Sequence, residues 1–452
     1  MNILMEDSGE KRKVMVLGGG ISGLATAWYL KKAGVPFTLI EKEDKVGGVI
    51  RSSEIEGTVV NFGPNSLRDK DGSLRALAKD VGLEDEMVEI SEAFKTRYIV
   101  RHQELQELVP SPKTLFTTKV LSAKGKWRIF AEPFISKGPE TDESVGAFLE
   151  RRIGKEAVDY LVDPVFSGIY AGDIYQMSKK EILPQLAENE QQFGSLIIGA
   201  FRSKKEKSDV KPTVLSFKKG VQQLAEAIQS KLTENIRHEK ILRVTNKEGG
   251  YLVETDKSTY HSDQVISCLP AHELANLLDN VEGDLKDALG QITYSPMVST
   301  QLIFKGENVD LEKQGFGFLI PRKENIRLLG AIWKTSIFPE LSKDDHFHFT
   351  LMTGGAHDKC LLSESIDDIE QEILQEFASL TGIKADPLYV RSVMWGKAIP
   401  QFHVGYEHIR EVLKQAEENY PGLYFGGNYR WGVSVPDCIK GAKTLVQKTF
   451  TL

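Results

Sequence analysis

The sequence has few cysteines and no long apolar run. Only 3 of its 452 residues are cysteine, and Cys268, Cys360 and Cys438 lie far apart. Three isolated cysteines make neither a disulfide framework nor a metal cluster, and they fit a reducing compartment. No segment approaches the roughly 18 uncharged apolar residues of a membrane span. Residues 1–14 lack the apolar core of a secretory signal. We therefore expect a cytoplasmic protein that at most rests on the inner surface of a membrane.

An excess of positive charge is also absent. The chain has 57 Lys and Arg against 64 Asp and Glu, a formal net charge of −7. Without a positive field to hold a phosphate backbone, we do not expect nucleic-acid binding. Hydrophobic residues make up 41% and charged residues 27%, which is typical of a globular protein. The length fits about two to four domains, or one large composite fold.

The first clear pattern is a strand–helix–strand unit near the start. Residues 13–17 form a short apolar run, which indicates a buried strand of a parallel sheet. A helical pattern follows over residues 22–33, and Gly34 would end it. Residues 37–41 are β-branched and apolar, which predicts a second strand. Together these segments predict one βαβ unit.

The turn inside this unit carries a dinucleotide fingerprint. Its first glycine permits the tight turn, its second lets the backbone approach a pyrophosphate, and its third lets helix and strand pack closely. The helix N-terminus would offer N–H groups to the phosphates. Glu41, which ends the second strand, can accept hydrogen bonds from ribose hydroxyls and argues against a 2′-phosphate. The motif G-x-G-x-x-G consists of Gly18, Gly19, Gly20, Ile21, Ser22 and Gly23.

Two further glycine clusters favour a flavin over a nicotinamide. Gly47-Gly48 follows the ribose-binding acid closely, and residues 62–66 read Phe-Gly-Pro-Asn-Ser. More close backbone approaches suit an extended flavin dinucleotide. Near the end of the sequence, the strand 423–425 leads through two glycines to a helix from about Val435. That helix N-terminus could stabilise negative charge on a reduced flavin ring, although it could also be an ordinary sheet–helix turn.

The middle of the chain is mixed. Residues 142–200 predict mainly helices, and residues 291–355 predict several alternating strands closed by a helix at about 366–380. The stretch 109–131 carries five basic and no acidic side chains, interleaved with aromatic and aliphatic ones. It is either a solvated surface or a surface that docks on anionic lipid.

Taken together, these motifs resemble the FAD-dependent amine oxidase superfamily and, within it, the protoporphyrinogen oxidase family. The likeness runs nearly end to end and includes residues 95–100, 163–173 and 315–319. It implies an α/β (α+β composite) fold in three domains. These are a Rossmann-like FAD-binding domain (1–90, 213–275 and 410–452), an inserted helical domain that could face a membrane (91–212) and a β-rich substrate domain (276–409).

The resemblance also implies site residues. An arginine that pairs with a substrate propionate falls on Arg97, and apolar contacts with one face of the tetrapyrrole fall on Leu319 and Ile332. Met352 stands where an aromatic residue often covers the opposite face, so the stacking there differs. FAD contacts fall on the glycine turn (Gly18 to Gly23) and on Glu41, Lys42, Gly48, Val49, Gly63, Pro64, Asn65, Ser66, Ile241, Val433, Ser434 and Val435.

The activity that the resemblance implies is oxygen-dependent oxidation of protoporphyrinogen IX to protoporphyrin IX in haem biosynthesis. It would use three two-electron hydride transfers to flavin N5, release hydrogen peroxide and need no catalytic side chain. A coproporphyrinogen III oxidase, which differs in the side chains of its substrate, stays open. Contact with a membrane, hand-over to a ferrochelatase and a homodimer are further expectations that the sequence does not decide.

Other functions are less favoured. Amine oxidases of the superfamily place a lysine near the flavin, and no lysine stands between Gly290 and Phe304, where it is expected. A flavoprotein that keeps FAD only for stability would not need the long apolar substrate region. His346 and His348 share one face of a strand but have no third metal ligand nearby, so no metal site is expected. Cys438 at a helix start is conceivable as a thiol of low pKa.

Overall fold

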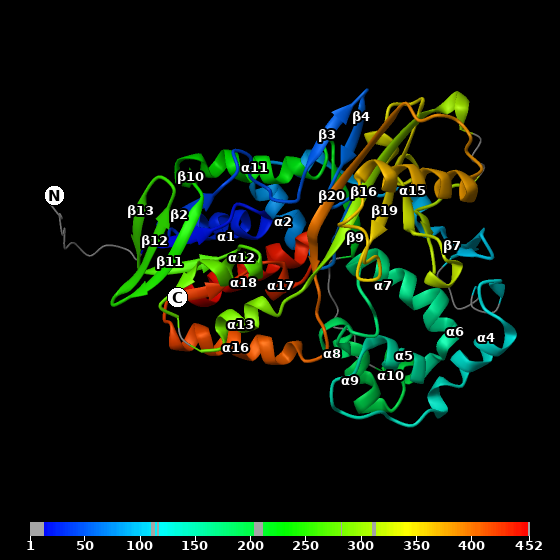
Figure 1. Ribbon diagram of the computed structural model, residues 1–452, viewed down its shortest axis with the longest axis horizontal. Helices are drawn as coiled ribbons and strands as arrows, with labels where there is room; N and C mark the ends of the chain where they lie inside the picture. The colour runs from blue at the N-terminus through cyan, green and yellow to red at the C-terminus, as the bar shows by residue number, and fades with distance from the viewer. Residues whose placement is uncertain are drawn as a thin grey trace.

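The computed structural model describes residues 13–109, 114, 117–202, 211–281, 283–309 and 313–450. Residues 1–12, part of the basic stretch 109–131 and most of the segment 203–212, whose charged and polar sequence predicts an exposed loop, lie outside the described residues. Figure 1 shows layered α/β structure at the left, a large sheet at the upper right and a group of helices at the lower right. Among the described residues, none of the helices combines the length and the apolar character needed to cross a membrane.

A five-stranded parallel sheet forms the centre of the α/β part. Its order is β10-β2-β1-β14-β21. All four residues of β1 and of β14 are buried, as expected of a parallel sheet covered on both faces. The sheet joins the beginning, middle and end of the sequence. Its strands are β1 (Val14–Leu17), β2 (Phe37–Glu41), β10 (Ile236–His238), β14 (Gln264–Ser267) and β21 (Leu423–Phe425).

Helices cover one face of this sheet. Their apolar sides share one core with β1 and β2. They are α1 (Ile21–Lys32), α2 (Ser73–Asp80), α11 (Gln222–Leu232) and α18 (Val435–Phe450). The opposite face packs on a small sheet and three helices. These are β11 (Ile241–Lys247), β12 (Gly250–Thr255), β13 (Thr259–Ser262), β15 (Leu278–Asp279), α12 (Ala271–Leu277), α13 (Leu285–Gly290) and α16 (Tyr406–Asn419).

A seven-stranded sheet forms the β-rich part, in the order β20-β16-β19-β18-β17-β7-β8. One face packs on α15 (Ile366–Thr381) in a core that contains Phe318, Trp333 and Phe349. The other face packs against α14 (Lys334–Ile337) and against hydrophobic residues of the α/β part. The strands are β7 (Arg97–Arg101), β8 (Glu104–Leu108), β16 (Tyr294–Lys305), β17 (Gly317–Leu319), β18 (Leu328–Trp333), β19 (His346–Gly354) and β20 (Tyr389–Pro400).

The helices at the lower right of Figure 1 are joined by a buried ion pair. Arg152 and Glu132 are both fully buried and bonded to each other. Burial raises the pKa of Glu132, but hydrogen bonds from Ser195 Oγ, Leu196 N and Arg152 outweigh it and the net pKa is lowered. The helices are α4 (Ala123–Phe130), α5 (Val145–Ile153), α6 (Lys155–Ala157), α7 (Asp163–Tyr170), α8 (Lys179–Ile182), α9 (Pro184–Phe193) and α10 (Leu196–Arg202).

Smaller elements complete the fold. β3 (Ser52–Ile55) and β4 (Thr58–Asn61) form a hairpin, and β9 (Thr213–Phe217) pairs with β5 (Leu67–Asp69) and β6 (Met87–Glu89). Short turns of 3-10 or π helix are η1 (Glu84–Glu86), η2 (Glu92–Lys95), η3 (Glu132–Phe134), η4 (Val158–Val162), η5 (Thr233–Asn235), η6 (Gly306–Asn308), η7 (Arg322–Glu324) and η8 (Pro339–Leu341).

Candidate functional site

A cavity of about 690 Å³ opens at the carboxyl ends of the five parallel strands. β1 lies between β2 and β14. The chain adds β2 and β10 on one side of β1 and then adds β14 and β21 on the other side, so the strand order reverses at β1. Ligands of open α/β sheets bind in the crevice that forms at such a position. Each of the five strands sends residues from its carboxyl end into the cavity: Gly18 and Gly20 after β1, Glu41 and Lys42 at β2, Glu239 after β10, Cys268 after β14 and Gly427 after β21.

The structure brings most of the predicted cofactor residues together around this cavity. They come from six separate stretches of sequence, which extend from the first glycine turn to the start of the last helix. The predicted residues that line the cavity are Gly18, Gly20, Ile21, Ser22, Glu41, Lys42, Gly48, Val49, Pro64, Ile241, Val433 and Val435.

The other predicted cofactor residues support the wall without lining it. A Cβ on Gly23 would lie 1.8 Å from the carbonyl oxygen of Gly18, and a Cβ on Gly63 would lie 2.0 Å from that of Val49. Both positions therefore need glycine because backbone packs directly against them. Gly19 N donates to Glu41. Ser434 Oγ accepts from Asp437 N at the start of α18, and Ser66 stands beside Asn65 just beyond the cavity.

The glycine turn has the shape that a diphosphate requires. Gly18 has φ +96°, a conformation that side chains rarely adopt, and its N–H donates to Ile40 O at 2.8 Å. No heavy atom lies within 4 Å of the place where a Cβ of Gly20 would stand. The open space beside Gly20 and the N-terminus of α1 next to it fit an anionic dinucleotide.

Glu41 is held firmly at the rim of the turn. One carboxylate oxygen accepts from Gly19 N at 2.6 Å, and the other accepts from Glu43 N at 2.9 Å. A carboxylate has about four acceptor positions, so lone pairs remain for hydroxyl groups of a ligand. The second glycine cluster is tied to the same turn, because Gly47 N donates to Gly19 O at 2.8 Å.

Two thiols line the cavity and are poor nucleophiles. Burial raises the pKa of Cys268 and the pKa of Cys438 to about 12. The alternative interpretation of Cys438 as a thiol of low pKa is therefore wrong: α18 does begin near it, but the apolar surroundings of the thiol outweigh the helix N-terminus. His346 and His348 are also buried, and each bonds to a polar side chain, Thr58 and Gln301 respectively.

The sequence missed several residues of the cavity wall. Trp395 comes from β20 of the seven-stranded sheet, and its Nε1 donates to Phe62 O at 3.1 Å. Arg51 donates to Val46 O at 3.0 Å. Cys268, Leu269 and Pro270 follow β14, and the rule that ligands bind at the carboxyl ends of parallel strands could have indicated them. Trp395 could not be found this way because its strand belongs to another sheet.

The four predicted substrate residues share one face of the seven-stranded sheet. Leu319 pairs with Gly330, and Gly330 pairs with Met352, so these side chains point the same way across three strands. Ile332 is two residues beyond Gly330 and therefore on the same side. Ile99 pairs with Leu319, which puts Arg97 on this face as well. Thr350, also on this face, donates to Asn65 Oδ1 at 3.0 Å. We call the surface formed by Arg97, Leu319, Ile332 and Met352 the sheet face.

Arg97 stands exposed at the edge of the sheet face. Its guanidinium lies 5.6 Å from the centre of the Phe316 ring. Partial desolvation, and then the charge of Arg68, lower the pKa of Arg97. Among the described residues, neither arginine forms an ion pair with a carboxylate. Two cationic groups at one edge of an apolar surface suit a flat ligand that carries carboxylates.

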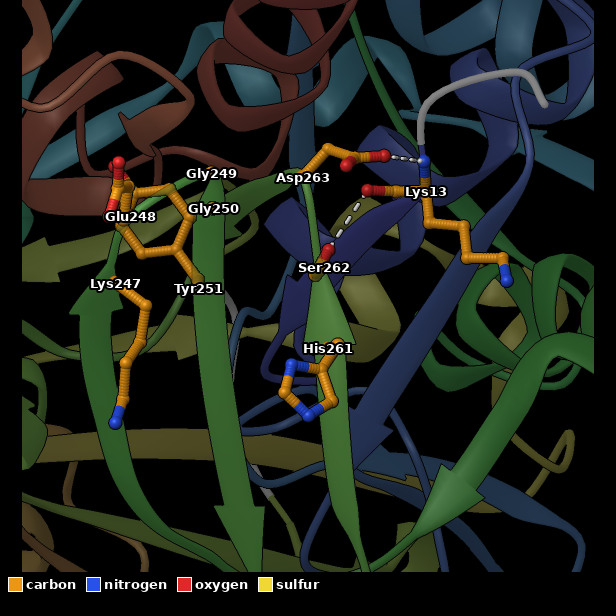
Figure 2. Close-up of a pocket in the computed structure, with 9 residues that line it drawn as sticks. All are labelled: Lys13, Lys247, Glu248, Gly249, Gly250, Tyr251, His261, Ser262 and Asp263. Atoms are coloured by element: carbon orange, nitrogen blue, oxygen red, sulfur yellow. Dashed lines mark hydrogen bonds between the residues drawn. The ribbon is translucent and has the colours of Figure 1, made fainter. Parts of the chain in front are cut away.

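A second, polar hollow lies far from these residues, on the β12–β13 hairpin. Its volume is about 270 Å³, and Figure 2 shows Lys13 donating to Asp263 and accepting from Ser262. Lys247, His261 and Tyr251 stand around it on separate strands (Figure 2). It contains no predicted site residue. Burial raises the pKa of Tyr251 to about 12, and its hydroxyl donates to Tyr420 O and Pro421 O.

Comparison with known proteins gives one consistent result. Residues 21–448 match the family model of flavin containing amine oxidoreductases. Protoporphyrinogen oxidase 2, chloroplastic/mitochondrial, of Arabidopsis thaliana is 31% identical over an alignment of 463 positions that covers 94% of this chain and 91% of that protein. Coproporphyrinogen III oxidase of Bacillus subtilis (strain 168) is 30% identical over an alignment of 467 positions that covers 98% of each chain.

The fold agrees with these relatives. A crystal structure of a protein from Exiguobacterium sp. 255-15, provisionally named protoporphyrinogen oxidase, has a TM-score of 0.84 and 26% sequence identity. It covers 98% of this chain and 99% of that one. The similarity therefore extends over the cavity, the sheet face and the helical part together.

Proposed function

The chain belongs to the flavin-containing amine oxidoreductase family, and from that premise we propose that it oxidises a porphyrinogen to a porphyrin. It is an FAD-dependent oxidoreductase. The observation that carries the proposal is the sheet face, where three apolar side chains lie on one side of the sheet with Arg97 at its edge. Thr350 on the same face is hydrogen-bonded to Asn65, which follows the cavity residue Pro64. A flat macrocycle with carboxylates along one side would fit such a surface.

The residues around the cavity would hold FAD along its length. The glycine turn would receive the diphosphate, Glu41 the ribose, and Val433 to Val435 with the start of α18 the flavin ring. When bound, FAD would accept a hydride at N5 in each of three two-electron cycles and pass the electron pair to oxygen, which leaves as hydrogen peroxide. The buried thiols and the apolar wall would exclude water from the same space.

The sheet face would position the substrate. Leu319, Ile332 and Met352 would bury the ring plane, and Arg97 would bind a propionate with Arg68 close by. No side chain on this face is an acid or base placed to exchange protons with the ring. The proposal therefore assigns the protein the tasks of binding, orienting and excluding water.

Protoporphyrinogen IX is the substrate that we expect, and coproporphyrinogen III is the second candidate. The second is favoured by the similarity to the Bacillus subtilis coproporphyrinogen III oxidase and by the presence of two arginines at the edge of the sheet face. Coproporphyrinogen carries four propionates and protoporphyrinogen carries two. Coproporphyrinogen therefore offers more carboxylates that Arg68 could bind in addition to the one at Arg97.

Turnover of both porphyrinogens by the purified holoenzyme tests the proposal. We expect porphyrin fluorescence to appear with consumption of oxygen, and the ratio of the two kcat/KM values then identifies the substrate. Arg97→Ala should raise KM about tenfold or more and leave the FAD content unchanged. Arg75→Ala, which removes a half-buried arginine paired with Glu89, is the matched control. Oxidation of a primary amine but of neither porphyrinogen would refute the proposal.

A membrane contact is proposed for the helical part. Trp127, Phe134 and Phe201 are 75%, 88% and 87% exposed, and they lie on α4, η3 and α10. η3 contacts both α4 and α10. Lys124, Lys126 and Arg128 lie on the same α4. Exposed aromatic rings among basic groups suit an anionic lipid surface at the inner face of a membrane. Flotation with anionic vesicles, compared with the triple alanine variant of the aromatic residues, tests this.

A homodimer and hand-over of the product to a ferrochelatase stay predictions. Sedimentation of the purified protein would determine its oligomeric state. Transfer of porphyrin to an added ferrochelatase, measured with and without a competing porphyrin trap, would test the hand-over.

A further inference from the structure

Lys334 is a buried lysine without a carboxylate partner. It follows β18 at the start of α14 and is 1% exposed. Its Nζ donates to the main-chain oxygen of Asn65 at 2.7 Å and lies 5.0 Å from the centre of the Phe338 ring. Among the described residues it forms no ion pair. Lys179, which is 2% exposed, binds Glu143 at 2.9 Å instead. A buried ammonium group is costly unless a negative charge compensates it.

The position of Lys334 connects it with the cofactor cavity. Asn65 follows Pro64, which lines the cavity. Trp395, on β20 of the seven-stranded sheet, also lines the cavity, and its Nε1 donates to Phe62 O, two residues before Pro64. Since the glycine turn would receive the diphosphate, the ring of an extended dinucleotide would reach toward Pro64. The ammonium group of Lys334 therefore lies directly behind the wall at which the flavin ring would stand.

None of the neighbouring titratable groups supplies the missing negative charge. α14 packs against β19, η2 and η8. On β19, burial and the charge of Lys334 hold the pKa of His348 well below its usual value, so this histidine is neutral, and His346 bonds to Thr58 Oγ1 at 2.8 Å. The remaining groups are exposed. On η2, Glu92 pairs with Lys95, and on η8 the only titratable group is the exposed Glu340.

We propose that Lys334 is the buried cation that balances negative charge on the bound flavin ring. The lysine takes up a proton when that charge forms and releases it when the charge is lost. Burial lowers the pKa of Lys334 to about 7, so the exchange falls in the neutral range. Lys334 acts through the wall at Asn65 and is a positioning residue. The inference rests on FAD as the cofactor and is independent of which substrate is oxidised.

Sulfite binding to the holoenzyme tests the proposal without any substrate. Sulfite adds its electron pair to the oxidised flavin ring and leaves a negative charge there, and the visible flavin absorbance is lost. We expect the sulfite dissociation constant to rise at least about tenfold in Lys334→Met and in Lys334→Gln. Lys334→Arg should stay within about threefold of the wild type, because it keeps the charge. Lys343→Met, which removes an exposed lysine, should change nothing.

The glutamine variant separates charge from hydrogen bonding. Its amide can still donate to Asn65 O, so a purely structural lysine would be replaced well by glutamine and poorly by arginine. Wild-type affinity for sulfite in Lys334→Gln would overturn the proposal.

If a variant does not retain FAD, the pH dependence of sulfite binding to the wild-type holoenzyme tests the proposal instead. Expressed for the sulfite dianion, the dissociation constant should be flat below about pH 7 and should rise about tenfold per pH unit above it, because binding then requires uptake of a proton. A flat profile across that range would equally overturn the proposal.

Discussion

The buried amine of Lys334 destabilises the folded chain. Its pKa falls from 10.5 to about 7, so folding at pH 7 releases about half a proton per chain. We expect Lys334→Met to raise the free energy of unfolding of the apoprotein by about 4 kcal/mol at pH 7. The lysine penalty is greatest below pH 7 and disappears as the pH rises toward 10.5.

Denaturant unfolding of both proteins at neutral pH and at about pH 10 measures this difference. The advantage of the methionine variant should shrink at the higher pH. Lys343→Met serves as the control for a change in net charge. An advantage of the same size at both pH values would contradict the expected titration.

Gly20 permits a second prediction at the residue scale. A Cβ there would meet no protein atom but would project into the space assigned to the diphosphate. Gly20→Ala should therefore fold like the wild type and lose at least about 100-fold in FAD affinity. Gly290→Ala, at an exposed helix end where a Cβ also meets nothing, is the control. Flavin fluorescence titration of the apoprotein measures the affinity, and unchanged FAD binding in Gly20→Ala would rule out the assignment.

The sequence predicts those cavity residues that belong to one short, continuous motif. The glycine turn and Glu41 could be located because a strand, a turn and a helix lie within one short segment. Trp395 and Lys334 could not, since each reaches the cavity region from the other sheet. The resemblance to a known family supplied Leu319, Ile332 and Met352, and the strand register places them on one face.

At the scale of elements, strong local patterns matched the structure. The strand at 37–41 is β2, and the helix expected at 366–380 is α15. The helical pattern of residues 73–88 predicts one helix, and this prediction is wrong beyond Asp80, because Gly82 takes φ +87° and the chain turns into β6. The pattern of residues 236–245 predicts a single strand, and this prediction is also wrong: the segment contains β10 and β11, which belong to different sheets. β20 was missed since its residues are only half buried and show no clear alternation.

The ion pair between Glu132 and Arg152 yields a prediction about how helices are held together. Glu132→Gln leaves the buried Arg152 with only Glu190, at 3.4 Å, as a charged partner, and Glu190 is shared with Arg151. We expect a loss of about 3 kcal/mol in the free energy of unfolding. The contribution is present above the unfolded pKa of Glu132 and is lost as the pH falls through its lower folded value. Glu84→Gln, which breaks an exposed pair with Lys79, should cost less than about 1 kcal/mol.

Urea unfolding and limited proteolysis of the helical part would measure these effects. FAD absorbance should be unchanged in Glu132→Gln, because the ion pair lies outside the cavity. Equal losses in the two variants would show that burial of the pair is not the cause.

For the whole molecule, the division into three domains stays a proposal. The five-stranded sheet combines segments from the start, middle and end, as the proposed FAD-binding domain requires. β7 and β8 fall within 91–212, the segment expected as the helical domain, yet they extend the seven-stranded sheet. Their edge position explains the difference, since a hairpin that is local in sequence can join any available sheet edge.

Because the cavity is built from both ends of the chain, FAD should stabilise the whole α/β part. At free FAD of about 1,000 times its dissociation constant, we expect about 4 kcal/mol of added stability. Denaturant midpoints measured with and without FAD test this. An equal gain in Gly20→Ala would place the stabilising ligand elsewhere.

The cavity wall has a consequence for biosynthesis. Val433, Val435 and Cys438 belong to it, and they are translated about 400 residues after the glycine turn that they face. A nascent chain whose α18 is still inside the ribosome has an incomplete pocket, so flavin loading must wait until synthesis of this region is over. A cell short of flavin would therefore accumulate full-length, colourless apoprotein rather than stalled intermediates.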